Sequence, residues 1–574
     1  MRFCIPVRSV RSVGVWLVLA CVVASINPLR GDEEPSAFER QKDEALRANR
    51  LPETFRQAKN VILFVGDGMG VSTITAARIL DGQNKGQTGE ENVLFFERFP
   101  YTALSKTYSI NMQTPDSAAT MTAMVTGHKT KTGVLSYDSS IVPDDYSSTV
   151  DGGGESIPVR TLLEQFELAG KASGVVTTTT LTHATPGACY AHSPSRNWVN
   201  GDYTGSSKAG NPEYEEAIKN GFKDIARQFV EFPYGDGVDV ALAGGHRDFL
   251  PKPAEEESES DPKPAGPDTS SSPEDENADG PPTTGNRIDG RNLVAEWSAQ
   301  EGRRVVWDRQ ALLGVSLPET RQLLGFFGSG NLAFEADLVD DDERSVPRLS
   351  EMASTAFKML RRNKKGFFLM VEGGRIDHAH HASNAKRALM ETVEFDAAVR
   401  AVYGAMTEQE RAETLIVVTA DHSHVFVLAG YAKRGNPILG KVAVNKSDAE
   451  GEPTPEFVSD ALGLPYTTLG YYNGAGFRGM MMNTKTFEHA HGPKPLSKNW
   501  KFINIPRSAR PDLTHIDTEH INFLQESAVP LSSETHGGED VAIFATGPGS
   551  HMFRGSREQN YIYHAIRLAL GMNE

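Results

Sequence analysis

Short runs of apolar and β-branched residues recur along the chain, separated by longer stretches of mixed polarity. The runs cover residues 60–65, 174–180, 366–371, 414–419 and 541–544. Runs of this kind are typical of strands that are buried on both faces, as in parallel sheets. A helical pattern over 385–406 lies between two of them. The sequence therefore predicts an α/β fold, a three-layer sandwich around a large, mostly parallel central sheet.

The N-terminal segment has the pattern of an export signal. Arginines precede an apolar run within residues 1–26, which is too short to span a membrane comfortably. The cleavage point stays open, and the residues around Cys21 loosely resemble a lipoprotein box. We therefore expect a periplasmic or extracellular protein, with a lipid anchor at Cys21 as an alternative. Cys189 is then the one other cysteine of the mature chain, so no internal disulfide is expected.

Three further segments do not belong to the alternating strands and helices of the predicted core. Residues 36–50 are highly charged and predict a projecting helix. Residues 252–286 are rich in Pro, Glu, Ser and Asp and predict a disordered acidic insertion. Residues 431–515 predict a small inserted lobe, which divides the core into a first part, 51–430, and a last part, 516–574.

Length and charge narrow the class of protein. The 574 residues can bury a large core, and the formal net charge of -17 argues against a surface for nucleic acid or anionic membranes. We therefore expect no nucleic-acid partner.

Metal-competent side chains follow the predicted strands. In open α/β sheets the carboxyl ends of the strands are where ligands bind. Carboxylate with imidazole suits zinc, and carboxylate with hydroxyl suits magnesium. Asp377 and His381 are four residues apart, which places them on one face of a helix. The candidates are Asp67, His183, Thr185, Glu372, Asp377, His378, His380, His381, Asp421, His422, His424 and His536.

A helix start at Asp116-Ser117 carries the candidate nucleophile. Ser and Asp are common helix caps, so one interpretation gives these residues a structural role alone. In the other, Ser117 lies between two divalent ions and attacks a phosphoryl group in line. Arg196 then supplies a planar donor for the phosphoryl oxygens.

Six motifs in order resemble those of alkaline phosphatase across nearly the whole mature chain. They are Gly66-Asp67-Gly68-Met69-Gly70, Asp116-Ser117-Ala118, His183-Ala184-Thr185-Pro186, Glu372-Gly373-Gly374-Arg375-Ile376-Asp377-His378-Ala379-His380-His381, Thr419-Ala420-Asp421-His422-Ser423 and Thr535-His536-Gly537-Gly538-Glu539-Asp540. The resemblance implies a secreted phosphomonoesterase that acts on phosphate monoesters at alkaline pH. It also implies a homodimer, with the lobe at 431–515 as the crown and the segment at 36–50 as an arm around the second subunit.

The resemblance also implies a role for each site residue. Ser117 would form a phosphoserine, and Arg196, oriented by Asp116, would hold the phosphate. The first zinc would take Asp377, His381 and His536, the second zinc Asp67, Asp421 and His422, and a magnesium Asp67, Glu372 and Thr185. His380 and His424 match no ligand and are interpreted as structural.

The chain resembles the animal enzymes more than the enterobacterial form at His183 and His378, which replace an aspartate and a lysine. His183 removes an acid beside the third ion, so we expect weaker magnesium retention, with zinc as an alternative. Animal enzymes also bind calcium, but Gly328 stands where an acidic ligand is expected. A diesterase or sulfatase of the same fold and an inactive binding protein are the other functions considered. The intact ligand set and the absence of a sulfatase motif at Ser117 favour the monoesterase.

Overall fold

The computed structural model describes residues 56–203, 212–253, 281–338, 344–447, 453–476 and 510–572. The predicted signal segment at 1–26, with Cys21, and the predicted helix at 36–50 lie outside these ranges. So do residues 254–280 of the predicted acidic insertion and residues 448–452 and 477–509 of the predicted lobe. Those predictions remain as they stand.

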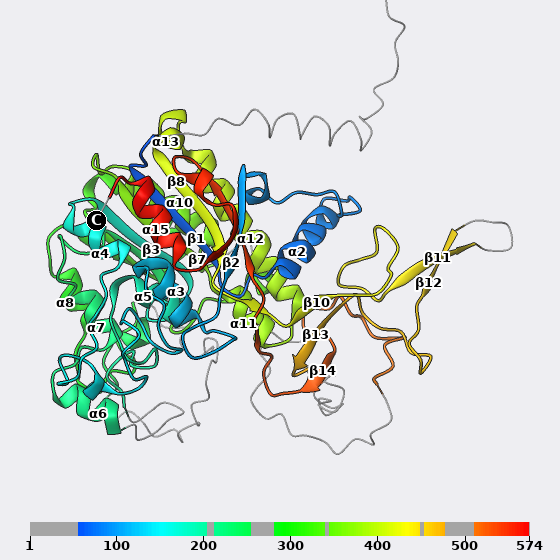
Figure 1. The fold of residues 1–574 in the computed structure, drawn as a ribbon, viewed down its shortest axis with the longest axis horizontal. Helices are drawn as coiled ribbons and strands as arrows, with labels where there is room; N and C mark the ends of the chain where they lie inside the picture. The colour runs from blue at the N-terminus through cyan, green and yellow to red at the C-terminus, as the bar shows by residue number, and fades with distance from the viewer. Residues whose placement is uncertain are drawn as a thin grey trace, which may run out of the picture. The chain divides into compact units, whose positions relative to one another are not determined.

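A ten-stranded sheet forms the centre of the fold (Figure 1). Its strand order is β17-β2-β16-β8-β1-β7-β3-β4-β6-β5. Neighbouring strands are parallel except where β16 pairs with β2 and β8. The bounds are β1 (Asn60–Gly66), β2 (Tyr101–Lys106), β3 (Ala172–Thr180), β4 (Val240–Gly244), β5 (Arg303–Val306), β6 (Gln322–Phe326), β7 (Phe367–Gly373), β8 (Thr414–Ala420), β16 (Val541–Thr546) and β17 (Gly555–Glu558). All five predicted strands are present, as β1, β3, β7, β8 and β16, which confirms the predicted sheet.

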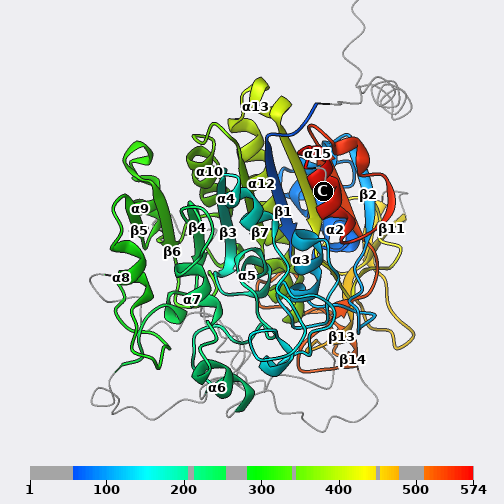
Figure 2. The same cartoon turned by 60° about the vertical axis from the view of Figure 1, so that its left-hand side comes forward.

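Helices cover both faces of this sheet (Figure 2). Alternate side chains of β1 point to opposite faces, so Leu63 joins one hydrophobic cluster and Phe64 the other. On the Leu63 side lie α3 (Ser117–Thr126), α4 (Leu162–Leu168), α5 (Ala184–Tyr190), α7 (Ile225–Val230), α8 (Leu293–Ser298) and α15 (Tyr561–Ala569). On the Phe64 side lie α2 (Val71–Asn84), α9 (Arg309–Leu313), α10 (Leu349–Leu360) and α12 (Ala385–Ala405). The predicted helix over 385–406 is α12, and the three layers confirm the predicted fold class.

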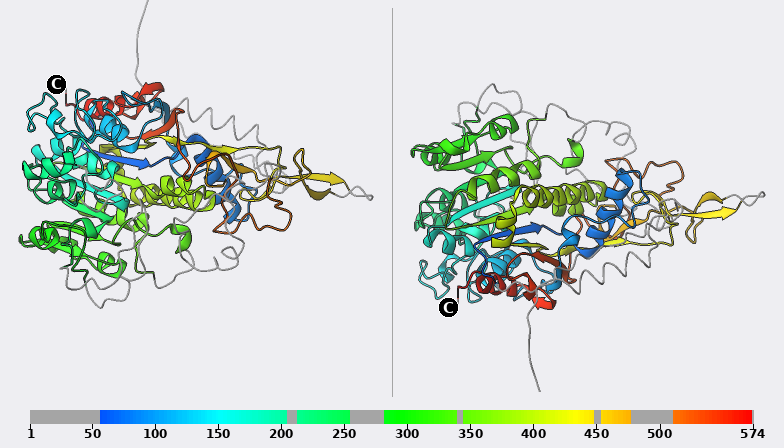
Figure 3. Two further views of the ribbon diagram at one scale, coloured as in Figure 1. Left: turned by 90° about the horizontal axis from the view of Figure 1, so that it is seen from below. Right: turned by 90° about the horizontal axis from the view of Figure 1, so that it is seen from above.

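Shorter elements complete the described chain. The remaining α-helices of the described ranges are α6 (Pro212–Lys219), α11 (Arg375–His381) and α13 (Glu408–Glu413). A small sheet joins β10 (Phe426–Leu428), β13 (Leu469–Gly474) and β14 (Ser527–Pro530), and β11 (Ala443–Ser447) pairs with β12 (Pro453–Phe457) in a hairpin beyond it (Figure 3). The last pair is β9 (Ser423–His424) with β15 (His536–Gly537). The small sheet thus includes β10 and β14, which lie just outside the predicted lobe. In the ranges described here, no helix combines the length and the hydrophobicity needed to cross a membrane.

Candidate active site

Four adjacent strands of the large sheet bring the predicted metal-competent residues together. Strands β8, β1, β7 and β3 are neighbours, and they are parallel. Their carboxyl ends therefore meet along one edge of the sheet. Asp421 follows β8, Asp67 follows β1, Glu372 is the penultimate residue of β7, and His183 follows β3. Residues more than 350 positions apart in the chain become neighbours in this way.

Helix α3 starts beside this edge and places Ser117 at its first turn. The Asp116 side chain caps the helix, since its Oδ1 accepts a hydrogen bond from Ala119 N at 3.2 Å. Capping therefore falls to Asp116, and Ser117 is left to face the sheet. The Ser117 hydroxyl is buried, and its Oγ lies 3.4 Å from Asp67 Oδ1 and 3.3 Å from His422 Nε2.

One group of ligand atoms surrounds this hydroxyl. His422 Nε2 lies 3.4 Å from Asp67 Oδ1 and 3.3 Å from Asp421 Oδ2. A tetrahedral zinc ion with bonds of about 2.0–2.1 Å separates its ligand atoms by roughly 3.3 Å. The separations of His422 Nε2 from Asp67, Asp421 and Ser117 therefore match those between ligands of one ion.

A second group lies next to it. Asp377 and His381 face the same side of α11, as their spacing predicts, with Asp377 Oδ1 3.4 Å from His381 Nε2. His536, on β15, places its Nε2 3.3 Å from Asp377 Oδ1 and 3.1 Å from His381 Nε2. The rings of His422 and His536 stack with their centres 3.6 Å apart, so the two groups are adjacent.

The tautomers of these imidazoles favour a cation in each group. The Nδ1 atoms of His381, His422 and His536 lie 2.6 Å, 3.3 Å and 2.8 Å from backbone carbonyl oxygens, so each Nδ1 is the donor. In the neutral rings Nε2 then carries a lone pair, directed at carboxylate oxygens and at another Nε2. Lone pairs facing each other at these distances repel unless a positive charge lies between them. The donor set therefore fits metal ions.

A third group lies on the other side of Asp67. Ligand atoms of Asp67, His183 and Glu372 lie within 4.8 Å of one another. Thr185, in the first turn of α5, is completely buried, and its side chain interacts with Glu372. Asp67 Oδ2, Asp421 Oδ2 and Glu372 Oε1 are buried with no hydrogen-bond partner among the described residues. Orphaned carboxylate oxygens of this kind are what bound cations normally satisfy.

Burial and mutual repulsion shape the ionisation of these carboxyls. Burial, followed by the charges of Asp421 and Asp377, raises the pKa of Asp67 well above its usual range. Burial raises the pKa of Glu372 to about 7, although a hydrogen bond from Thr177 opposes this. At Asp377 burial also disfavours the charge, but His381 and His424 outweigh it and lower the pKa. The site thus crowds buried carboxyl groups whose full ionisation is favoured only when divalent cations neutralise them.

Arg196 reaches the site from the loop after α5. Its Nη1 donates to Asp116 Oδ2 at 3.1 Å, and its Nη2 lies 3.2 Å from His183 Nε2. Its side chain is 25% exposed, so the guanidinium borders both the buried site and solvent. Asp116 therefore caps α3 with one oxygen and orients Arg196 with the other.

His424 and Glu534 support the second group, and the sequence reasoning missed this contact. His424 Nε2 lies 2.7 Å from Asp377 Oδ1, and its Nδ1 lies 2.6 Å from Glu534 Oε2. Although burial opposes the charge, Glu534 and Asp377 raise the pKa of His424 to about 10. His380 instead contacts Thr73 and Tyr471. In the sequence, the position of Glu534 two residues before His536 could have indicated that Glu534 lies near the site.

His183 and His378, the two positions at which the sequence resembles the animal enzymes, lie side by side. The rings of His183 and His378 meet edge to face with centres 5.5 Å apart, and His378 Nδ1 lies 3.2 Å from Arg375 Nη1. Gly328 offers no side chain at the calcium position, and its carbonyl accepts a hydrogen bond from Gly245 N. An acidic calcium ligand is therefore missing at Gly328.

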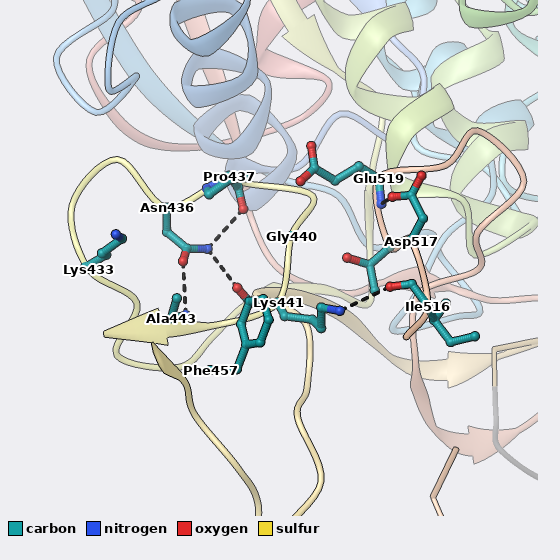
Figure 4. Close-up of a pocket in the computed structure, with 11 residues that line it drawn as sticks. Lys433, Asn436, Pro437, Gly440, Lys441, Ala443, Phe457, Ile516, Asp517 and Glu519 are labelled. Carbon is teal, nitrogen blue, oxygen red and sulfur yellow. Dashed lines mark hydrogen bonds between the residues drawn. The ribbon is translucent and has the colours of Figure 1, made fainter. Parts of the chain in front are cut away.

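A pocket in the small lobe is separate from these groups (Figure 4). Its volume is about 350 Å³, and none of the predicted site residues lines it. It is lined by Lys433, Asn436, Pro437, Gly440, Lys441, Ala443, Phe457, Ile516, Asp517, Thr518 and Glu519.

A large parallel sheet with buried carboxylates and imidazoles gathered around a serine is typical of a metal-dependent hydrolase. Residues 58–572 match the family model for alkaline phosphatase. The tissue-nonspecific alkaline phosphatase of Gallus gallus is 39% identical over 553 residues, covering 95% of this chain and 91% of the relative. The isozyme of Homo sapiens is 38% identical over 564 residues, covering 96% and 92%. The chain belongs to the alkaline phosphatase family, and it is a phosphomonoesterase.

Solved structures agree on the fold. The alkaline phosphatase of Thermus thermophilus superposes with a TM-score of 0.58 at 22% identity, covering 92% of this chain and 94% of that one. The enzyme of the Antarctic bacterium TAB5 gives a TM-score of 0.51 at 19% identity, covering 91% and 100%. These structures share the three-layer arrangement of this chain.

Proposed function

We propose that this phosphomonoesterase works through a phosphoserine on Ser117, at a site that holds two zinc ions and one magnesium ion. The observation that carries the proposal is the position of the Ser117 hydroxyl, 3.3–3.4 Å from the ligand atoms of His422 and Asp67. A serine that only capped a helix would not need to be buried among metal-competent side chains.

Each proposed ion has its own ligands. Asp377, His381 and His536 would hold the first zinc; Asp67, Asp421 and His422 the second zinc; and Asp67, Glu372 and Thr185 the magnesium. When bound, the zinc ions lower the pKa of the serine hydroxyl and stabilise the leaving oxygen. The tautomers of the three imidazoles and the orphaned carboxylate oxygens support this assignment.

The residues of the chain carry the reaction in two steps. Ser117 gives up its hydroxyl proton as its Oγ attacks phosphorus, the phosphorus–oxygen bond to the alcohol breaks, and the leaving alcohol oxygen takes up one proton in exchange. Water then attacks the phosphoserine, which releases inorganic phosphate and restores the hydroxyl. Arg196 binds the non-bridging oxygens in both steps, and Asp116 fixes its direction through the 3.1 Å hydrogen bond.

His183 is expected to weaken the third site. In place of an acid it offers a neutral imidazole, whose Nε2 lies 3.2 Å from Arg196 Nη2. Magnesium prefers oxygen ligands, whereas zinc accepts nitrogen. We therefore infer that magnesium is held loosely and that zinc can replace it.

The cellular setting is proposed from the sequence and the family. An export signal in residues 1–26 would deliver the protein to the periplasm or the exterior, with a lipid at Cys21 as the anchoring alternative. A homodimer would use the lobe at 431–515 and the arm at 36–50. The acidic charge of the chain supports the expectation that nucleic acid is not a partner.

The test compares a chromogenic phosphate monoester with its diester, with and without a zinc chelator, for the wild-type protein and Ser117→Ala. We expect monoester turnover that the chelator abolishes and that Ser117→Ala lacks. Turnover that survives both treatments would show that neither the metals nor Ser117 carry the reaction. Preference for the diester would favour the diesterase alternative.

A further inference from the structure

The loop that carries Arg196 is paired with the segment that follows α3. Leu135 and Ser193 exchange two backbone hydrogen bonds, of 2.9 and 3.0 Å, in a short antiparallel bridge. At one end of this bridge Arg196 N donates to Gly133 O at 2.7 Å. Gly133 N in turn donates to Asp116 Oδ2 at 3.0 Å. The backbone at Arg196 is thus placed relative to Asp116 by this two-segment bridge.

His192 closes the other end of the bridge and is held at every polar atom. Its Nδ1 lies 2.8 Å from Ser136 O, and its Nε2 lies 2.7 Å from Glu164 Oε1. The Gln228 side chain accepts from His192 N and donates to His192 O, both at 2.8 Å. Hydrogen bonds therefore fix both the backbone and the ring orientation of His192.

The hydrogen-bond partners of the His192 ring require it to be protonated and positively charged. Ser136 O and the carboxylate of Glu164 can both only accept, so both ring nitrogens must donate, and only imidazolium has two N–H groups. Burial opposes the charge, but the hydrogen bond and the charge of Glu164 outweigh it and raise the pKa of His192. Glu164 is 1% exposed, so the pair is shielded from solvent screening.

Glu164 lies in the first turn of α4, where hydrogen bonds fix its side chain. Its Oε2 accepts from Thr161 N at 2.9 Å, which completes the capping box of that helix. The Thr161 hydroxyl donates to Cys189 O, near the end of α5. The charge that holds His192 is therefore fixed to the body of the fold rather than to the mobile end of a surface side chain.

We propose that His192, held by Glu164 and Gln228, is a positioning residue that aims Arg196 at the phosphate through the Leu135–Ser193 bridge. The inference rests on the proposed role of Arg196 in phosphate binding. It predicts that loosening His192 weakens phosphate binding only while the Arg196 guanidinium is present.

The test is a double-mutant cycle on the full-length holoenzyme, with the inhibition constant of inorganic phosphate as the readout. Glu164→Gln removes the charge but keeps the size of the side chain. We expect it to raise the inhibition constant about tenfold, and to change it by less than about twofold in the Arg196→Ala background. Equal changes in both backgrounds, or a change of less than twofold in the wild-type background, would overturn the proposal.

Two further variants separate positioning from stability. Glu351→Gln removes a carboxylate at the same third position of α10, where its Oε2 accepts from the N-cap backbone, Arg348 N, at 2.9 Å and the side chain pairs with Arg309. We expect it to lower the melting temperature without changing phosphate inhibition. Gln228→Leu releases the backbone of His192 without touching its ring, at the cost of one further hydrogen bond to Lys223 O, and serves if Glu164→Gln does not fold. It should weaken phosphate binding with the same dependence on Arg196, and additive effects would again count against the proposal.

The cycle also distinguishes this inference from the proposed function. If Arg196→Ala alone leaves phosphate inhibition unchanged, the role of Arg196 in binding phosphate is wrong. If Arg196→Ala weakens phosphate binding and Glu164→Gln does not, only the positioning role of His192 is wrong.

Discussion

The Asp116 carboxylate serves three donors at once, and this makes its two roles separable. Oδ1 accepts from Ala119 N and caps α3, while Oδ2 accepts from Gly133 N and from Arg196 Nη1. Serine caps helices about as well as aspartate, but its single hydroxyl cannot reach both sets of donors. Asp116→Ser should therefore keep the helix cap and release Arg196.

The expected loss of phosphate affinity follows from the strength of the lost hydrogen bond between Asp116 and Arg196. A hydrogen bond to a charged group contributes about 1.5–3 kcal/mol, which corresponds to roughly a ten- to hundredfold change in affinity. The Asp116 side chain is 13% exposed and that of Arg196 is 25% exposed, so solvent can replace part of the contact. We therefore expect the lower end of the range, about a tenfold weaker affinity for inorganic phosphate.

The assay is competitive inhibition by phosphate, combined with thermal unfolding. Asp308→Ser is the matched control, because Asp308 caps α9 through Ala311 N at 2.7 Å and has no part in the proposed site. Both variants should keep nearly the wild-type melting temperature, and only Asp116→Ser should weaken phosphate. An unchanged inhibition constant in Asp116→Ser would refute the view that Asp116 orients Arg196.

Three other perturbations test separate parts of the account. His424→Ala removes the 2.7 Å partner of Asp377 and should weaken zinc retention about 10–100-fold, measured as zinc content after dialysis; undiminished zinc would contradict this. His183→Asp should increase retained magnesium, and full retention by the wild-type protein without added magnesium would contradict the reasoning. Burial raises the pKa of Glu167 to about 9. The folded chain therefore keeps a proton that the unfolded chain releases above about pH 4.5. Because the unfolded state binds fewer protons in this range, the free energy of unfolding falls as the pH rises towards 9. Glu167→Gln should therefore lose less melting temperature than wild type between pH 6 and 9, and equal losses would exclude Glu167 as the cause.

The core of the fold was predictable because burial on both faces leaves a plain signal in the sequence. The five apolar runs became β1, β3, β7, β8 and β16. Strands such as β2 and β17 were not predicted: β17 is the edge strand and is polar, and β2, next to it, alternates buried and exposed residues. The place of β2 depends on its pairing with β16, and that of β17 on its pairing with β2, which no local pattern encodes.

The grouping of the candidate site was predictable from motif order and from strand ends, but its supporting contacts were not. Asp377 and His381 follow from helical spacing alone. The contact of His424 with Asp377 joins residues 47 positions apart and depends on how β9 pairs with β15. In the same way, the contact of His192 with Glu164 depends on the packing of α4 against α5, so the sequence alone could not favour it over a surface role.

The most direct test of the account is to find the phosphate on the enzyme. The holoenzyme is mixed with a phosphate monoester, quenched in acid within the first turnovers, digested and examined by mass spectrometry. The account predicts one phosphate on the peptide that contains Ser117, located on Ser117 itself and missing when the metal is first removed. A phosphate on another residue, or full turnover by Ser117→Ala, would contradict it.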